Sequence, residues 1–323
     1  MDNEKKSMYE PGVILGGCTL RRQLNDSGEA MVFLAESGNE EKKEVIIKFF
    51  KCGYGEDEIK YLDVLTNHEQ RRNIVEMLKS FETPEIRLGM VFKRYETDLF
   101  GILGDRQRLQ PSTIQKYMKG LMEGLQFIHR MDYIHRDIKV RIYRRVLFIL
   151  SIREFCKKTA DPENLLIDGE TICIADFGET VLSTSDKVVK PGTLPYLTIE
   201  HILGYKENTK SMDIWAAACV LGAMFQGSHL FSQNSNLQTI HAIRLLLGNH
   251  TKETWPEMDK LPLMQSIELP PVGEKTFSKI ENITKEAADL MEQMMKYDPT
   301  KRLMASQVLN HEYFKKEASA QAN

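Results

Sequence analysis

The stretch that decides the fold is interrupted: it begins as His135-Arg136-Asp137-Ile138-Lys139 and resumes as Pro162-Glu163-Asn164-Leu165-Leu166-Ile167. Asp176-Phe177-Gly178 follows twelve residues after Asn164. Asp137 and Asn164 lie 27 residues apart, and taking out the 22 residues of 140–161 leaves a separation of five. The line then reads HRDIKPENLLIDGETICIADFG. The triplets His135-Arg136-Asp137 and Asp176-Phe177-Gly178 are each common by chance. Together, at this spacing, they indicate a functional site.

This line resembles the catalytic loop and the metal-binding loop of protein kinases, in which HRD and DFG flank a segment like PENLLI. The resemblance covers roughly residues 15–314. It implies an α+β fold of two lobes, with a β-rich N-lobe and a mainly helical C-lobe. The domain expected is 13–314, divided into an N-lobe at 13–93 and a C-lobe at 94–314, with an atypical insert at 140–161 and tails at 1–12 and 315–323.

The chemistry that the resemblance implies is transfer of the γ-phosphate of ATP to Ser or Thr hydroxyls of proteins. This reaction asks the protein mostly for positioning and for neutralisation of charge. Asp137 is expected to accept the proton of the substrate hydroxyl, and Lys139 to neutralise charge on the transferred group. Asn164 and Asp176 are expected to hold Mg²⁺. The alternative is a pseudokinase that binds nucleotide or acts as a scaffold.

Two further motifs of the N-lobe fit the resemblance. Val45-Ile46-Ile47-Lys48 matches the VAIK strand, whose Lys holds the α- and β-phosphates. The helical run that begins at Glu58 resembles the regulatory helix, so Glu58 is expected to pair with Lys48. Ile46 stands where the family has Ala against the adenine, and its extra carbons should crowd that pocket.

The glycine-rich loop of the family is degenerate in this chain. With Val32 taken as the Val of GxGxxGxV, the three Gly positions fall on Asn25, Ser27 and Ala30. Only the neighbouring Gly28 remains. A structural turn and a phosphate clamp are both open interpretations of this stretch.

Residues 90–95, followed by Asp98-Leu99, resemble the hinge between the lobes. Phe92 then takes the gatekeeper position behind the adenine, and the backbones of Lys93 and Tyr95 are expected to bond the adenine edge. Val32 and Leu166 complete the predicted nucleotide contacts.

The C-lobe carries architectural motifs. Apolar residues between Pro111 and Met131 recur at helical spacing and predict an amphipathic core helix. Thr193 is expected to hydrogen-bond to the HRD aspartate and to Lys139, as in Ser/Thr kinases. Glu200 and Arg302 are expected to form a buried ion pair, and Asp213 to anchor the catalytic loop.

The segment from Leu246 to Met258 resembles the LGTPxxxxWPE region of cyclin-dependent kinases, in the CMGC group. The nearest branch that the residues suggest is that of the cell-cycle-related kinases, which are tied to ciliary control. The link between Lys48 and Glu58 is too short for the usual cyclin contact. Leu197 replaces the Arg that favours proline after the target residue. Of the three Arg expected around an activation-loop phosphate only Arg136 is present; the other positions hold Asp57 and Val181.

Composition sets the compartment that we expect. The 323 residues carry a net charge of −3, which gives no hint of nucleic-acid binding. Five cysteines without a CxxC pair suit a reducing compartment. The N-terminus lacks the apolar stretch of a signal peptide, and the longest apolar run, near 146–152, is too short to span a bilayer. We therefore expect an intracellular protein of cytoplasm, nucleus or cilium, without a membrane partner, acting on proteins.

The insert 140–161, VRIYRRVLFILSIREFCKKTAD, admits two interpretations. It is either a docking or autoinhibitory element, or an unspliced stretch of the gene that has been translated. We favour the second, because loops of this length without a role are uncommon in compact domains. A longer loop adds little closure entropy, so the fold should tolerate it.

Overall fold

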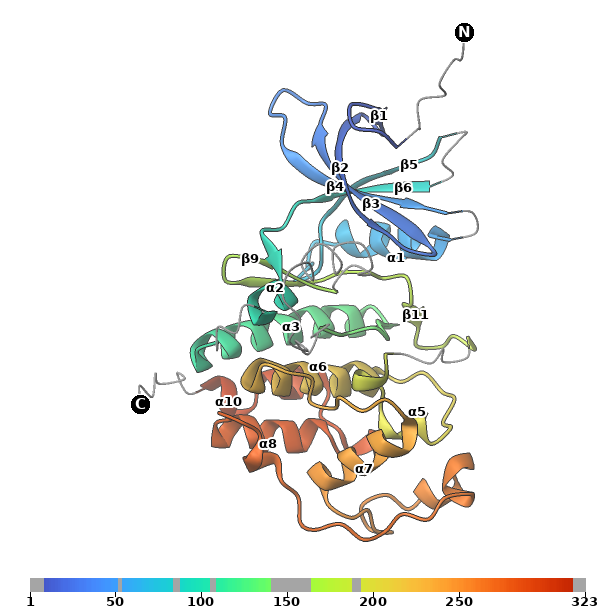
Figure 1. Cartoon of the computed structure of the whole chain (residues 1–323), viewed down its shortest axis with the longest axis vertical. Helices are drawn as coiled ribbons and strands as arrows, with labels where there is room; N and C mark the ends of the chain where they lie inside the picture. Colours follow the sequence, from blue (N-terminus) through green and yellow to red (C-terminus); the bar gives the residue numbers. More distant parts are fainter. Residues whose placement is uncertain are drawn as a thin grey trace, which may run out of the picture.

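A twisted antiparallel sheet forms the N-lobe of the computed structural model, which describes residues 9–51, 54–83, 88–104, 109–140, 164–187 and 193–315 (Figure 1). Among these residues the sheet has six strands in the order β1-β2-β3-β4-β6-β5. The strands are β1 (Ile14–Leu15), β2 (Cys18–Asp26), β3 (Ala30–Ser37), β4 (Glu44–Phe50), β5 (Met77–Phe81) and β6 (Leu88–Lys93).

Side chains along each strand of this sheet point alternately to two faces. One face forms a buried core, and the other faces the C-lobe. Leu20, Phe33, Ile47 and Phe49 are almost fully buried on one side, and the rings of Phe33 and Phe49 pack edge to face. Because successive side chains of a strand point to opposite faces, the intervening residues of β3 and β4 face the other way. That second face carries Lys48.

One helix, α1 (Glu56–Thr66), accompanies the sheet. Its buried residues are Glu58, Tyr61, Leu62 and Leu65, which follow the spacing of one helix face. Gly55 precedes the helix with φ of 94°, and a Cβ there would run into the ring of Phe50. A glycine is therefore required where the chain turns into α1.

The C-lobe is built from helices, most of them below the N-lobe in Figure 1. They are α2 (Leu99–Gly104), α3 (Pro111–Arg130), α5 (Ile199–Ile202), α6 (Lys210–Gln226), α7 (Asn236–Leu247), α8 (Lys285–Met294), α9 (Ala305–Leu309) and α10 (Glu312–Lys315). Short 3-10 turns are η1 (Leu194–Tyr196), η2 (Met258–Lys260), η3 (Pro262–Gln265), η4 (Phe277–Lys279) and η5 (Pro299–Lys301).

Short strands line the upper edge of the C-lobe. They are β7 (Thr97–Asp98), β8 (Tyr133–Ile134), β9 (Leu165–Asp168), β10 (Thr171–Ile174) and β11 (Val181–Leu182). β9 pairs with both β10 and β7, and β11 pairs with β8. These paired strands flank residues 135–140.

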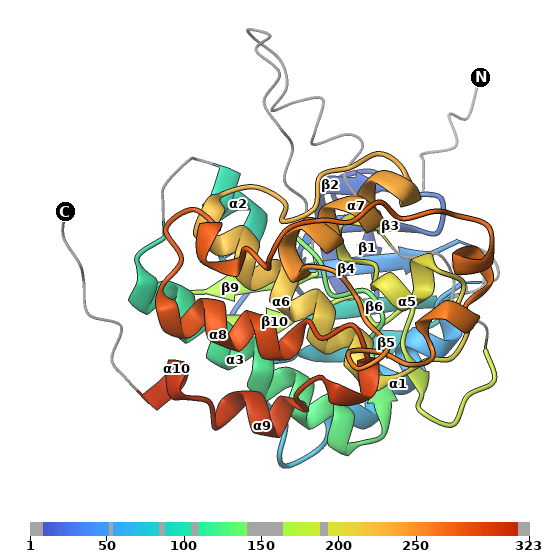
Figure 2. The ribbon, with the colours of Figure 1, turned by 90° about the horizontal axis from the view of Figure 1, so that it is seen from below.

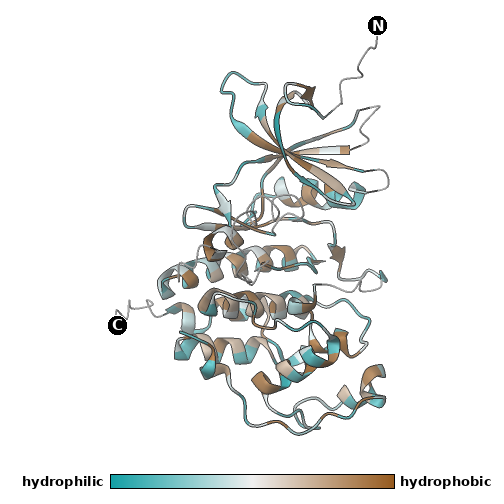
Figure 3. Ribbon diagram, viewed as in Figure 1, coloured by the Kyte–Doolittle hydropathy of each residue, from teal (hydrophilic) through white to brown (hydrophobic). Residues whose placement is uncertain are grey.

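The core of the C-lobe sits around α3 and α6, which lie side by side in both ribbon views (Figures 1 and 2). The predicted amphipathic helix is confirmed as α3, whose apolar face is buried. From Met212 to Phe225, α6 is buried on every side, as expected for a helix at the centre of a lobe. Bands of hydrophobic and hydrophilic residues alternate along the C-lobe helices (Figure 3). In the part of the chain that the structure describes, no helix combines the length and apolar character needed to cross a membrane.

A buried ion pair ties α5 to the C-terminal part of the lobe. Arg302 donates to both carboxylate oxygens of Glu200, at 2.7 and 2.6 Å, and both side chains are fully buried. The guanidinium also lies 4.7 Å from the ring centre of Trp215. The Arg302 cation outweighs the effect of burial and lowers the pKa of Glu200. The predicted Glu200–Arg302 pair is thereby confirmed.

Replacing Arg302 by Leu should destabilise the protein strongly, because it leaves the Glu200 carboxylate buried without its partner. Breaking a buried pair in this way costs about 3–5 kcal/mol. We expect a fall of that size in the free energy of unfolding, measured by urea denaturation with tryptophan fluorescence. The control is Lys301→Leu at the exposed neighbouring residue, which should stay within about 0.5 kcal/mol of wild type. Equal stability of the Arg302 variant and wild type would contradict the assignment.

Candidate active site

Lys48 joins three separate elements at the boundary between the lobes. Its Nζ lies 2.9 and 2.7 Å from the two carboxylate oxygens of Glu58 on α1. The same nitrogen lies 2.9 Å from Oδ1 of Asp176, which follows β10. The predicted Lys48–Glu58 pair is therefore formed, and Asp176 shares it.

Burial and charge together set the ionisation of this group. Burial lowers the pKa of Lys48, but the carboxylates of Asp176 and Glu58 outweigh burial and raise it above the ordinary value. Burial raises the pKa of Glu58 to about 7, against the pull of the Lys48 ammonium. Burial also acts to raise the pKa of Asp176, but the Lys48 ammonium outweighs it, so that this pKa is lowered. Asp176, which is half-buried, therefore keeps its negative charge.

The catalytic-loop residues converge although the chain between them is long. Lys139 Nζ donates to Oδ2 of Asp137 at 2.6 Å. Asn164 Nδ2 donates to the carbonyl of Asp137 at 2.6 Å and to its Oδ2 at 2.8 Å. Burial raises the pKa of Asp137, and Lys139 opposes that rise. Asp137 and Asn164 are thus in contact although 27 residues separate them. This is the contact expected if residues 140–161 were absent and the separation were five.

Asp213 fixes the backbone of the catalytic loop, as predicted. Its carboxylate accepts from the amide of His135 at 2.9 Å and from the amide of Arg136 at 2.8 Å. It also contacts Nε2 of His129 at 2.9 Å. Arg136 has φ of 67°, a backbone conformation that persists only when the surroundings hold it. The buried α6 supplies that hold.

His135 and Phe177 link the catalytic loop to the Asp176 segment, a contact that sequence reasoning missed. Their rings meet edge to face with centres 4.9 Å apart. Nε2 of His135 also lies 3.1 Å from the carbonyl of Ala175. His135 belongs to the HRD motif and Phe177 to the DFG motif. The motifs therefore identified both residues, but they did not predict that the two rings touch.

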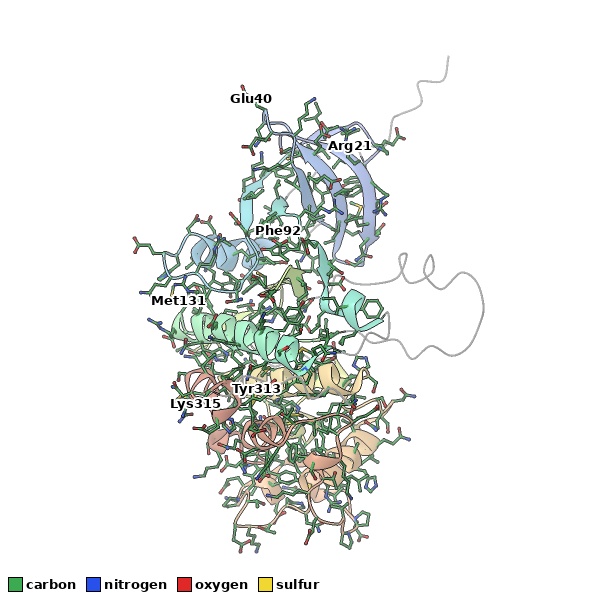
Figure 4. All side chains as sticks on the ribbon, turned by 90° about the vertical axis from the view of Figure 1, so that its left-hand side faces the viewer. Arg21, Glu40, Phe92, Met131, Tyr313 and Lys315 are labelled. Carbon is green, nitrogen blue, oxygen red and sulfur yellow. The ribbon has the colours of Figure 1, made fainter. Side chains whose placement is uncertain are left out.

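The other residues predicted to contact the nucleotide lie on strands of both lobes, Val32 on β3 and Leu166 on β9. Val32 on β3 pairs with Lys48 across the sheet, and both are half-buried. Leu166 on β9 pairs with Cys173 of β10. Ile46 pairs with Phe92, and Phe92 lies at the C-lobe side of the sheet (Figure 4). The two large side chains therefore lie directly opposite each other on the neighbouring strands β4 and β6.

The side chains of the hinge residues turn to partners of their own. Lys93 Nζ forms an ion pair with Asp168 at 2.6 Å. The Tyr95 hydroxyl accepts from the amide of Glu76 at 3.1 Å. The contact of their backbones with the adenine edge stays a prediction.

Arg136 is fully engaged by groups of the chain. Its Nη2 lies 3.1 Å from Oε2 of Glu179, and its Nε donates to the Glu179 carbonyl at 2.6 Å. Its Nη1 donates to Oδ1 of Asn208 at 3.0 Å. Asp57 on α1, at a position where Arg was expected, forms an ion pair with Lys187 of the activation segment. Sequence reasoning missed Glu179, Asn208 and Lys187.

One expectation at the substrate side needs correction. Thr193 lines a small cavity together with Asp137 and Leu197, but among the described residues it forms no hydrogen bond to Asp137 or Lys139. That prediction was wrong. Val140, the first residue of the predicted insert, is fully buried and its carbonyl accepts from the Tyr196 hydroxyl. It therefore packs with the C-lobe, while residues 141–163 lie outside the described residues.

Comparison with known proteins agrees with this geometry. The model of the protein kinase domain family matches residues 30–141 and 160–314. Cyclin-dependent kinase F-3 of Oryza sativa subsp. japonica is 31% identical over 263 residues, which cover 80% of this chain and 54% of the relative. Serine/threonine-protein kinase MAK of Rattus norvegicus is 31% identical over 310 residues, or 92% of this chain and 45% of the relative.

Cyclin-dependent kinase 9-A of Xenopus laevis is 29% identical over 277 residues, or 80% of this chain and 68% of that protein. The chain spans about half the length of the first two of these relatives. The family match covers both lobes and passes over part of the predicted insert. The motifs, the paired residues of the site and the family match together show that this chain belongs to the protein kinase family, in its cyclin-dependent-kinase-like CMGC group.

Proposed function

We propose that this chain is a serine/threonine protein kinase that transfers the γ-phosphate of ATP to hydroxyl groups of protein substrates. The observation that carries the proposal is the Lys48 ammonium, held between Glu58 and Asp176. A fixed cation thus lies next to Asp176, the carboxylate proposed to hold Mg²⁺. Catalysis of phosphoryl transfer rests largely on such fixed charges.

Asp137 and Lys139 are the proposed catalytic residues. Burial raises the pKa of the Asp137 carboxylate, which makes this oxygen a better proton acceptor than an ordinary aspartate. It can receive the proton of a substrate hydroxyl in this position. Lys139, which donates to Asp137, can turn its ammonium toward the transferred phosphoryl group.

Asn164 and Asp176 are the proposed magnesium ligands. Oδ1 of Asn164 is buried and has no hydrogen-bond partner among the described residues, although its Nδ2 is fully used. Mg²⁺ takes oxygen ligands and shares them with nucleotide phosphates, so an orphaned amide oxygen near a charged carboxylate fits this ion. Bound there, the metal supplies charge neutralisation for the phosphates.

The nucleotide would lie between the N-lobe face and β9. In this proposal Lys48, oriented by Glu58, meets the α- and β-phosphates. Val32 and Leu166 enclose the base, and the backbones of Lys93 and Tyr95 bond its edge. Ile46 opposite Phe92 narrows the pocket.

The proposed substrates are proteins with Ser or Thr hydroxyls. Leu197 stands where an Arg would favour proline-directed sites, so we do not assign that preference. An activating partner is compatible with the cyclin-dependent-kinase-like relatives, although the short link from Lys48 to Glu58 argues against the usual cyclin contact. Cytoplasm, nucleus or cilium as the place of action, and a role in cell-cycle or ciliary control, stay predictions.

The second candidate function is that of a pseudokinase that binds nucleotide or acts as a scaffold. It is favoured by the turn between β2 and β3, which lacks the family's glycines, and by Ile46. A thermal-shift measurement with Mg-ATP, followed by transfer of labelled phosphate to a generic acceptor protein, separates the two. Binding without transfer would favour the pseudokinase.

Asp176→Ala should abolish magnesium-dependent nucleotide binding or transfer while it leaves the fold in place. The substitution removes the proposed metal ligand and one of the two carboxylates that hold Lys48. Binding is measured by thermal shift with and without Mg²⁺, transfer with labelled ATP, and folding by circular dichroism. The control is Asp63→Ala on the exposed side of α1. Unchanged phosphotransfer in a folded Asp176 variant would refute the assignment.

Phosphatase treatment should leave the activity of the purified protein unchanged. A phosphate on Thr184 or Ser185 needs an Arg cluster to order the loop. Arg136 is already bonded to Glu179, and Asp57 is already paired with Lys187. Removal of phosphate is checked by mass spectrometry, with Thr184→Ala/Ser185→Ala as the matched variant. Loss of most activity after treatment would show that the loop does depend on phosphate.

Deletion of residues 140–161 should raise both the soluble yield and the rate of phosphotransfer. Pro162 then follows Lys139 directly, which restores the five-residue spacing. Small misplacements of catalytic groups cost on the order of a hundredfold in rate, and an apolar run such as 146–152 favours aggregation.

A matched variant with the 22 residues replaced by a Gly/Ser linker separates length from composition. It should recover solubility but not the full rate. A deletion variant less active than the intact chain would make the insert a working part of the protein. Sequencing of the transcript would show whether the segment is expressed.

A further inference from the structure

The turn between β2 and β3 lies just before Val32 in the sequence. The chain enters β3 at Ala30, and Val32 pairs with Lys48 across β3 and β4. In kinases the backbone of this turn covers the ATP phosphates. The partners of its amides therefore decide what the turn can bind.

Three amides of this turn, those of Ser27, Glu29 and Ala30, are bonded to the turn itself. Oγ of Ser27 accepts from the amide of Ala30 at 3.0 Å and from the amide of Glu29 at 3.4 Å. The amide of Ser27 donates to the carbonyl of Ala30 at 2.8 Å, and its hydroxyl donates to the same carbonyl at 2.9 Å. Converging amides of this kind form an anion-binding nest. Here a serine oxygen takes the place of the anion.

Lys51, which follows β4, also binds the turn. Its amide donates to the carbonyl of Glu29 at 2.8 Å. Its Nζ forms an ion pair with Asp26 at 2.7 Å and donates to the carbonyl of Ser27. The Glu29 side chain is exposed at the tip, where a carboxylate repels phosphate. The turn is thus closed from within and carries the wrong charge for a phosphate clamp.

We propose, on the basis of the proposed kinase function, that the Ser27 hydroxyl withdraws the amides of Glu29 and Ala30 from nucleotide recognition. The nucleotide is then held by the base pocket, by Lys48 and by the metal ligands, without the usual cover from the N-lobe turn. The phosphates gain little affinity from this turn. Ser27 therefore limits how strongly the site prefers MgATP over adenosine.

Calorimetric titration of MgATP and adenosine tests this in the wild type, Ser27→Gly and Ser27→Ala. Both substitutions remove the hydroxyl and free the two amides for a charged acceptor. We expect the affinity for MgATP to rise about tenfold, because a hydrogen bond to a charged group has about that worth. The affinity for adenosine should not change, since adenosine has no phosphate.

Two further measurements make the test specific. Ser37→Gly removes a serine at the other end of β3, where its hydroxyl bonds Asn39, and should change neither affinity. Hydrogen exchange of the Ala30 amide gives a readout that is independent of activity. This amide should be protected in the wild type with or without MgATP, and in Ser27→Gly only when MgATP is present.

The outcomes separate this inference from the proposed function. If adenosine binds but both Ser27 variants bind MgATP no more tightly than the wild type, the inference is overturned and the proposed function is unaffected. If neither ligand binds to any variant, the proposed function fails and the inference fails with it.

Discussion

The Lys48 ammonium, shared by the carboxylates of Glu58 and Asp176, is the contact on which the rest of the site depends. Glu58 lies 10 residues from Lys48 in sequence and Asp176 lies 128 residues from it. Since an uncompensated buried charge is costly, β4, α1 and the Asp176 segment hold one another in place. One cation thereby fixes the position of the regulatory helix and of a proposed metal ligand across the junction of the lobes.

The catalytic loop has a comparable support inside the C-lobe. Asp213 accepts hydrogen bonds from two consecutive backbone amides, and the second belongs to Arg136, which has a left-handed backbone. Asp176 has the same kind of backbone, with φ of 62°. Such conformations are stored strain that rigid surroundings must oppose. The buried α6 provides that rigidity, and the ring contact of His135 with Phe177 joins the two strained segments.

Groups of the chain itself fill two places where this fold usually receives a phosphate. Glu179 and Asn208 accept the hydrogen bonds of the Arg136 guanidinium. In related kinases this group would be available to an activation-loop phosphate. The Ser27 hydroxyl occupies amides of the turn that would otherwise face the nucleotide. In both cases an oxygen of the chain replaces an oxygen of a phosphate. Under the proposed function, internal contacts would hold both places, and the protein would gain less from a phosphate at either of them.

The sequence by itself determined the family and the two-lobed fold and named the candidate residues of the site, because motif spacing fixes which side chains share a strand, a helix face or a loop. It predicted that Lys48 meets Glu58, that Glu200 meets Arg302, and that Asp137 meets Asn164 despite the insert. It was wrong about the hydrogen bonds of Thr193, which lines a cavity with Asp137 without bonding it. Only the tertiary structure decided the pairing of Arg136 with Glu179, 43 residues apart, and the contacts of Lys51 with Asp26 and Ser27 of the turn. These contacts depend on backbone direction and on which distant segments come within hydrogen-bond reach, and neither is written in the spacing of residues along the chain.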